Sequence, residues 1–222
     1  MTVINLVVPP FFYSRIMIKD SENRSFMQPL FNYLAEFHPL SKAFIDYHLA
    51  HCTLVEVKKT KFILSPIDNN NSMYFVLSGV VRGFVKEAKK DISTWFSFER
   101  ELIAAIRHPH GNSNHSVEYL QAIEDCSLIR IPYHVIDYLY FNHPETNYIG
   151  RKFSELQYHA ASERSILARI PTALGRYHKL ERMQMDLSRI PLRYLASYLG
   201  IRLETLSRIR TKQVDSVRLK LA

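Results

Sequence analysis

The residues with the clearest chemical use are three polar side chains, Glu204, Ser207 and Arg208, near the C-terminal end of the chain. On a helix these three positions lie close to one another on the surface. An arginine can fork onto O6 and N7 of guanine, a glutamate can accept from the amino group of cytosine, and a serine can bond either base type. The pattern predicts a helix that reads base edges in double-stranded DNA. A salt bridge between Glu204 and Arg208, which are four residues apart, would use the same pair.

The segment from Leu192 to Thr211 has the pattern of two helices that meet at a steep angle. Such a pair needs a small residue where the helices cross, which Ala196 provides, and a residue that tolerates positive φ in the turn, which Gly200 provides. Pro191 suits the first turn of the leading helix. The apolar residues at the positions that the pair would bury are Leu195, Leu199, Ile201, Leu206 and Ile209. We therefore predict a helix-turn-helix; an ordinary helical hairpin that binds nothing is the alternative.

The formal net charge of +8 is concentrated in the same part of the chain. Residues 1–146 carry 14 basic and 15 acidic side chains, whereas residues 147–222 carry 15 basic and six acidic ones. This asymmetry is typical of a module that meets a polyanion, and a solvated basic face would have the same composition. Some side chains around the helix pair suit contacts with phosphate, which position a protein without selecting sequence. They are Arg189, Arg193, Arg202, Thr205, Arg210 and Lys212.

The sequence predicts two short helices in the N-terminal part of the chain, after a segment without a regular pattern. Residues 1–27 show no sustained pattern and stay unassigned. Apolar residues at helical spacing follow from Gln28. Ser41 is the predicted N-terminal cap of a second helix that ends near His51. These two short helices precede a change of period.

From Thr53 the hydrophobic period changes to two, the period of β-strands. Several short apolar runs lie between turn residues, and they predict an antiparallel β-roll, or jelly roll, within residues 28–142. Met73–Leu77 and Val80–Lys86 are predicted to pair as a hairpin around the turn at Ser78 and Gly79.

Residues 143–168 predict a single long helix with a narrow apolar stripe. The residues of that stripe are Ile149, Phe153, Leu156, Ala160 and Leu167. A long helix of this kind usually packs on another one, here from a second copy of the chain, and burial along its own β domain is the alternative. With the basic module at residues 169–222, we expect an α+β protein of three parts.

This order of parts resembles the Crp/Fnr family of bacterial transcription regulators, particularly the branch common in Bacteroidetes. The resemblance lies in Tyr74–Phe84 and Thr94–Glu99 of the predicted roll and, most specifically, in Ile190–Arg210. It implies a homodimer joined through the long helices, a cyclic-nucleotide-binding-like β-roll, and a C-terminal (winged) helix-turn-helix that binds double-stranded DNA. RNA polymerase is a further partner that the resemblance implies.

Within the recognition helix, the resemblance is to the Fnr branch. Glu204, Ser207 and Arg208 match its Glu-x-x-Ser-Arg pattern, and members of that branch favour TTGA-type half-sites. Leu203 stands where Crp-like members place an arginine. A half-site of the Crp type is therefore not expected.

The ligand pocket departs from the family pattern. Cyclic-nucleotide binders of the family use a Gly-Glu pair and an Arg-Ser pair, and the matching positions here are Arg100-Glu101 and Ser116-Val117. Glu101 is thus the only effector-pocket candidate. A phosphate taken from water needs a charge partner or several N–H donors, so the pattern argues against cyclic AMP. Two cysteines cannot ligate an iron–sulfur cluster, and we predict no cofactor and an effector of unidentified chemistry.

Other classes of protein find less support in the sequence. His108, His110 and His115 invite a metal-dependent, cupin-like β-roll enzyme, but the next acid, Glu118, lies too far along and Pro109 and Gly111 indicate a loop. We predict no metal site, no catalytic residue and no enzyme. A signalling adaptor that does not bind DNA is the remaining alternative.

The sequence also indicates where the protein works. No run approaches the roughly 20 apolar residues of a membrane helix, and no basic segment precedes the apolar N-terminus as in a signal peptide. The two cysteines, Cys52 and Cys126, lie in apolar surroundings and are predicted to be buried, reduced thiols. We therefore expect a cytoplasmic protein without a membrane partner.

Overall fold

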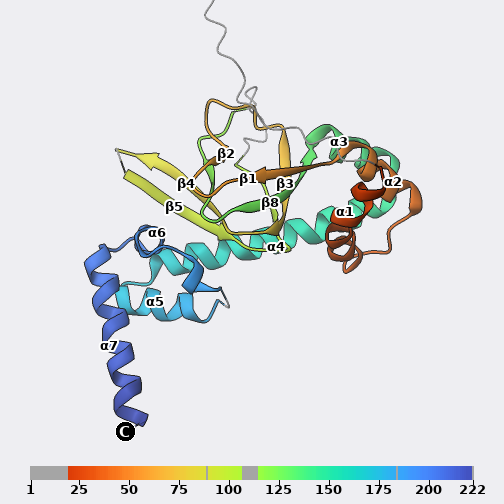
Figure 1. The fold of residues 1–222 in the computed structure, drawn as a ribbon. Helices are drawn as coiled ribbons and strands as arrows, with labels where there is room; N and C mark the ends of the chain where they lie inside the picture. The colour runs from red at the N-terminus through yellow and green to blue at the C-terminus, as the bar shows by residue number, and fades with distance from the viewer. Residues whose placement is uncertain (1–19, 89, 107–114, 184, 222) are drawn as a thin grey trace, which may run out of the picture.

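The computed structural model describes residues 20–88, 90–106, 115–183 and 185–221. Its helices are α1 (Asp20–Ala35), α2 (Lys42–His51), α3 (Tyr133–Asn142), α4 (Pro144–Arg169), α5 (Ala173–Glu181), α6 (Leu192–Tyr198) and α7 (Leu203–Leu221), with a short 3-10 helix, η1 (Leu187–Arg189), before α6. Figure 1 shows α1 to α3 at one end of a body of strands and α5 to α7 at the other, with α4 running along the body between them. We call residues 170–221, which hold α5, η1, α6 and α7, the C-terminal module.

The strands form two antiparallel sheets. They are β1 (Thr53–Val57), β2 (Phe62–Leu64), β3 (Ser72–Ser78), β4 (Val81–Glu87), β5 (Lys90–Ser97), β6 (Leu102–Ile103), β7 (Tyr119–Ala122) and β8 (Cys126–Pro132). One sheet has the order β1-β8-β3-β6 and the other β2-β7-β4-β5. This arrangement confirms the predicted α+β class and the β-roll.

Apolar side chains from both sheets meet in the centre of the roll. Strands of this kind bury alternate residues, so the period of two in the sequence becomes an inward and an outward face. Buried members of this cluster include Leu64 of β2, Val76 of β3, Val81 of β4, Leu120 of β7 and Leu128 of β8. The roll therefore has a core of its own.

The predicted hairpin between Met73–Leu77 and Val80–Lys86 is wrong. Both strands exist, as β3 and β4, but β3 pairs with β6 and β8 whereas β4 pairs with β5 and β7. Gly79, with φ at 92°, turns the chain from one sheet into the other. A Cβ atom there would lie 2.5 Å from the carbonyl oxygen of Asp125, so the close approach requires glycine as well.

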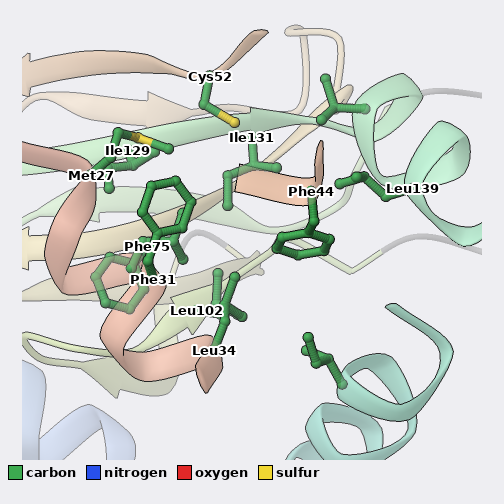
Figure 2. Packing of buried hydrophobic residues seen from close by; sticks show 13 residues of the cluster. Met27, Phe31, Leu34, Phe44, Cys52, Phe75, Leu102, Ile129, Ile131 and Leu139 are labelled. Carbon is green, nitrogen blue, oxygen red and sulfur yellow. The ribbon is translucent and has the colours of Figure 1, made fainter. Parts of the chain in front are cut away.

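The N-terminal helices bury a second apolar cluster against the outer side of one sheet (Figure 2). Met27 and Phe31 of α1, Phe44 of α2, Phe75 of β3 and Ile129 of β8 are all buried in it. Since α1 begins at Asp20, the last residues of the unassigned segment, up to position 27, belong to this helix.

Ser41 caps α2, as predicted. Its hydroxyl oxygen accepts a hydrogen bond from the backbone N–H of Phe44 (3.2 Å) and donates one to the Glu145 carboxylate at the start of α4 (2.5 Å). The cap thus also ties α2 to α4.

Replacing Ser41 with alanine is expected to lower the free energy of unfolding by about 1 kcal/mol, because an N-terminal N–H of α2 loses its acceptor. Urea denaturation would measure this change. Ser154→Ala is the matched control, since its hydroxyl donates only to the Gly150 carbonyl of its own helix; a change of less than about 0.5 kcal/mol is expected there. Equal stability of Ser41→Ala and the unmodified protein would contradict the structural role of the cap.

The cysteine prediction is confirmed. Cys52 and Cys126 are both free and buried. Burial raises the pKa of the Cys52 thiol to about 12 and that of Cys126 to about 11. Both are therefore protonated, unreactive thiols at neutral pH.

Two further predictions, on metal-ligating side chains and on membrane helices, can be compared with the described part of the chain. Within it, no three metal-ligating side chains gather in one place; His108 and His110 lie outside the described residues, so the predicted loop is not placed. None of the described helices is long and apolar enough to cross a membrane.

Candidate nucleic-acid interface

A tight turn joins α6 to α7 and fixes their relative direction. At the end of α6, the N–H of Ile201 donates to the carbonyl of Ala196 (3.0 Å) and the N–H of Gly200 donates to that of Ser197 (3.1 Å). This pair of bonds is the Schellman arrangement, which places the residue after the helix in the left-handed region. Gly200 occupies that position with φ at 62°, as the sequence predicts.

The apolar residues predicted to face inward do so. Leu195, Leu199 and Leu206 are buried, and Ile201 and Ile209 pack at the margin of the same cluster. The same cluster also contains Leu167 at the end of α4, residues of α5, and three buried residues of the β-roll, Val80, Phe96 and Ile123. One face of α7 is therefore anchored in the C-terminal module, and its opposite face is turned away from the protein.

The opposite face of α7 carries the three predicted base-reading residues. Glu204, Ser207 and Arg208 are all exposed, and none belongs to the buried core of the module. Glu204 and Arg208 form no salt bridge with each other in the described structure. The three side chains are thus presented together to solvent, which is what a groove-reading face requires.

Most predicted phosphate contacts flank that face. Arg193, Arg202 and Lys212 are exposed, and Thr205 and Arg210 are half-buried beside them. The guanidinium of Arg193 lies 4.6 Å from the ring centre of the neighbouring Tyr194. Four of these five side chains are basic, so the surroundings of the face carry a strong positive charge.

Arg189 requires a correction, because its guanidinium is bound to the β-roll. It forms a fork with the Glu99 carboxylate (2.7 and 2.8 Å) and two further hydrogen bonds with Glu124 (2.6 and 3.1 Å). The hydrogen bonds from Arg189 lower the pKa of Glu99 to about 2. Its donors are therefore directed at two carboxylates, and the predicted phosphate contact does not fit this geometry.

The predicted dimer stripe on α4 also requires a correction. Ile149 and Leu167 are buried in the apolar clusters of their own chain, and Phe153 packs against the cluster of the N-terminal helices. Ala160 faces a cavity beside the β-roll. Of the five residues, Leu156 is the most exposed, at 48 %. Most residues of the stripe therefore pack within their own chain. This is the alternative that the sequence left open, in which the helix is buried along its own β domain.

A cavity of about 460 Å³ lies where the roll, α4 and the C-terminal module meet. Glu101, the predicted effector-pocket residue, lines it and accepts a hydrogen bond from the Ser97 hydroxyl (2.6 Å). Desolvation raises the pKa of Glu101. Arg100 is turned elsewhere and pairs with Glu36, outside the cavity.

Sequence reasoning missed a second carboxylate in this cavity. Glu118 is fully buried and accepts hydrogen bonds from Thr94 Oγ1 (2.7 Å), Trp95 Nε1 (2.8 Å) and the backbone N–H of Ile106 (3.2 Å). Its only signal in the sequence is an acid between two apolar residues, Val117 and Tyr119, at the start of a predicted strand. Two carboxylates and one cation, Arg164 of α4, give the cavity an acidic lining that suits a cyclic phosphate poorly.

The fold is that of Crp/Fnr-family regulators. The structure is similar to FixK2 from Bradyrhizobium japonicum (TM-score 0.63, 17 % identity, 74 % of this chain and 85 % of that one). It is also similar to the c-di-GMP-responsive global regulator CLP from Xanthomonas campestris (0.62, 17 %, 79 % and 93 %). A third match is a crp/fnr-family transcriptional regulator from Eubacterium rectale (0.65, 15 %, 83 % and 88 %). The resemblance seen in the sequence is thus confirmed for the fold.

The likeness is one of structure. No protein-family model matches the chain, and no curated protein does. At these identities the matches establish the architecture, and the chemistry of the interface has to be argued from this chain's own residues.

Proposed function

We propose that this protein is a sequence-specific transcription regulator of the Crp/Fnr type that binds DNA as a homodimer. The observation that carries the proposal is the exposed face of α7, where Glu204, Ser207 and Arg208 stand together on a helix anchored from behind. A helix held in this way can enter the major groove, where such side chains discriminate between base pairs. The known regulators with the same fold support this reading.

The homodimer would present two copies of α7 to one face of the duplex. Two-fold symmetry then requires a palindromic site, with half-sites about 34 Å, or one helical turn, apart. RNA polymerase is the proposed partner in transcription. We propose that the protein is a regulator and not an enzyme. We also propose that the acidic cavity lined by Glu101 is an effector pocket that does not bind cyclic AMP.

Selection of bound sequences from a random pool of double-stranded DNA tests the proposal. We expect enrichment of an inverted repeat whose half-sites are about 10 base pairs apart from centre to centre. A parallel selection from a single-stranded pool is the control, and no such repeat is expected there. Failure to enrich any sequence at low salt would overturn the proposal and favour the adaptor that does not bind DNA.

A further inference from the structure

We propose that two polar clamps fix the C-terminal module on the β-roll and thereby select the spacing between the two half-sites. The first clamp joins α6 to the edge of β5, and the second joins η1 to Glu99 and Glu124. The spacing part of this inference rests on the proposed DNA binding by a homodimer. The docking itself can be tested without DNA.

The first clamp uses one serine to satisfy an open strand edge. β5 is the outermost strand of its sheet, so the backbone groups on its free side have no partner strand. Ser197 of α6 accepts a hydrogen bond from the N–H of Ser93 (3.0 Å) and donates one to the carbonyl of Asp91 (2.7 Å). Because one hydroxyl bonds two positions on the strand, α6 is fixed in register along β5.

A buried cation reinforces the first clamp. Arg82 of β4 is 1 % exposed, and its guanidinium lies 4.2 Å from the ring centre of Phe84 in the roll and 4.0 Å from that of Tyr194 in α6. Its Nε donates to the Ser93 hydroxyl (2.8 Å), and the Asp91 carboxylate lies 3.7 Å away. A cation held between two rings loses a favourable contact if the module moves away.

The second clamp is the four-bond contact of Arg189 with Glu99 and Glu124. A bidentate fork fixes orientation as well as distance, because two parallel N–H groups must meet two oxygens. Glu99 is held in turn by the backbone N–H of Gly79 (2.9 Å), which anchors the carboxylate in the roll. One point of contact would let the module pivot in any direction, whereas two separate points leave only rotation about the line that joins them. The apolar cluster shared by the roll and the module opposes that remaining rotation.

Docking leaves the predicted DNA-reading face open. In Figure 1, α7 projects away from the body of strands, and Glu204, Ser207 and Arg208 are exposed in this docked position. The direction of α7 relative to α4 is thus set inside each protomer. In a homodimer joined through α4, the distance between the two α7 helices would then be fixed, and so would the preferred spacing of half-sites.

The first experiment measures docking by amide hydrogen exchange in the full chain without DNA. In Ser197→Ala, exchange of the Ser93 amide is expected to accelerate by about tenfold or more, since that amide loses its acceptor. The matched control is Ser65→Ala, whose hydroxyl donates to Asp68 within the roll; the Ser93 amide should keep its protection there. Unchanged exchange at Ser93 in Ser197→Ala would overturn the first clamp.

The second experiment measures binding to the selected site with its spacer changed by one and two base pairs. The unmodified protein is expected to lose about tenfold in affinity for each base pair by which the spacer is lengthened or shortened. The two clamp variants are Ser197→Ala and Arg189→Lys, the second of which keeps the charge but lacks the fork. Each should lose only about threefold or less in affinity for the same change of one base pair in the spacer. The matched control is again Ser65→Ala, whose hydroxyl belongs to neither clamp, and it should behave like the unmodified protein.

The outcomes separate the inference from the proposed function. Faster Ser93 exchange with unchanged spacing preference would overturn the selection of spacing by the clamps. Tighter binding of the clamp variants at every spacing would also overturn it, because docking would then inhibit binding. If the unmodified protein binds no DNA, the proposed function fails together with the spacing part, while the exchange measurement still decides whether the clamps hold the module.

Discussion

Replacing Arg208 with alanine should weaken binding to the selected DNA site by roughly 5- to 150-fold, which corresponds to about 1–3 kcal/mol. The expected loss follows from the exposed position of Arg208 on the anchored helix α7, where its fork can meet O6 and N7 of one guanine. Preference at that base pair should relax, while the other positions keep theirs. Fluorescence anisotropy with a set of singly substituted duplexes would measure both effects.

The matched control for Arg208→Ala is Arg202→Ala, immediately before the first residue of the same helix. Arg202 is exposed and is a predicted phosphate contact, so its loss should weaken binding to all sequences alike and reduce the slope of log affinity against log salt by about one. If Arg208→Ala instead weakens binding equally on specific and random DNA, Arg208 is a phosphate contact, and base reading has to come from other residues.

The helix pair was predictable because its rules are local. Gly200 stands at a position that needs positive φ, and Leu195, Leu199 and Leu206 repeat at the spacing of a buried helix face. Each of these features depends on residues within a few positions of one another along the chain. The same is true of Ser41, whose capping bond reaches only to Phe44.

Contacts between segments that are distant in the sequence could not be predicted from such local rules. Arg189 has the type and neighbourhood of a phosphate contact, but Glu99 and Glu124, its partners, lie 90 and 65 residues away in the sequence. Nothing in the local pattern distinguishes an arginine that meets DNA from one that meets its own β-roll. The clamp could be found only once the fold had brought these groups together.

The β3–β4 connection fails as a prediction for a related reason. Ser78 and Gly79 mark a chain reversal in the sequence, and the structure has one there. A reversal within a sheet and a corner between two sheets use the same turn residues. Which strands pair is decided by the packing of both sheets around their shared core, and no short window contains that information.

The apolar stripe on α4 shows how far periodicity alone can go. It predicts the long helix with nearly the right limits, residues 143–168 against Pro144–Arg169. It does not distinguish a face that packs on the β-roll from one that packs on a second copy. Phe153 is unsuitable as a test of the dimer, because it packs against its own chain and a charge there would disturb the fold.

Exposed apolar residues of α4 give a sharper test of the homodimer. Leu156 and Ile166 are 48 % and 50 % exposed, and their separation of ten residues is that of two positions on one heptad seam. The double variant Leu156→Glu, Ile166→Glu should raise the dimer dissociation constant by about three orders of magnitude, because each interface would have to bury unpaired carboxylates. Sedimentation velocity over a concentration series would measure this shift.

The matched control for the double variant is Ile67→Glu, an equally large change of polarity at a residue that is 81 % exposed in the roll. It should leave the dissociation constant unchanged. The double variant should also bind a single half-site with nearly the affinity of the unmodified protein, since neither Leu156 nor Ile166 belongs to the apolar cluster that anchors α7. An undiminished dimer would place the interface away from α4, and the fixed distance between the two recognition helices would then need another origin.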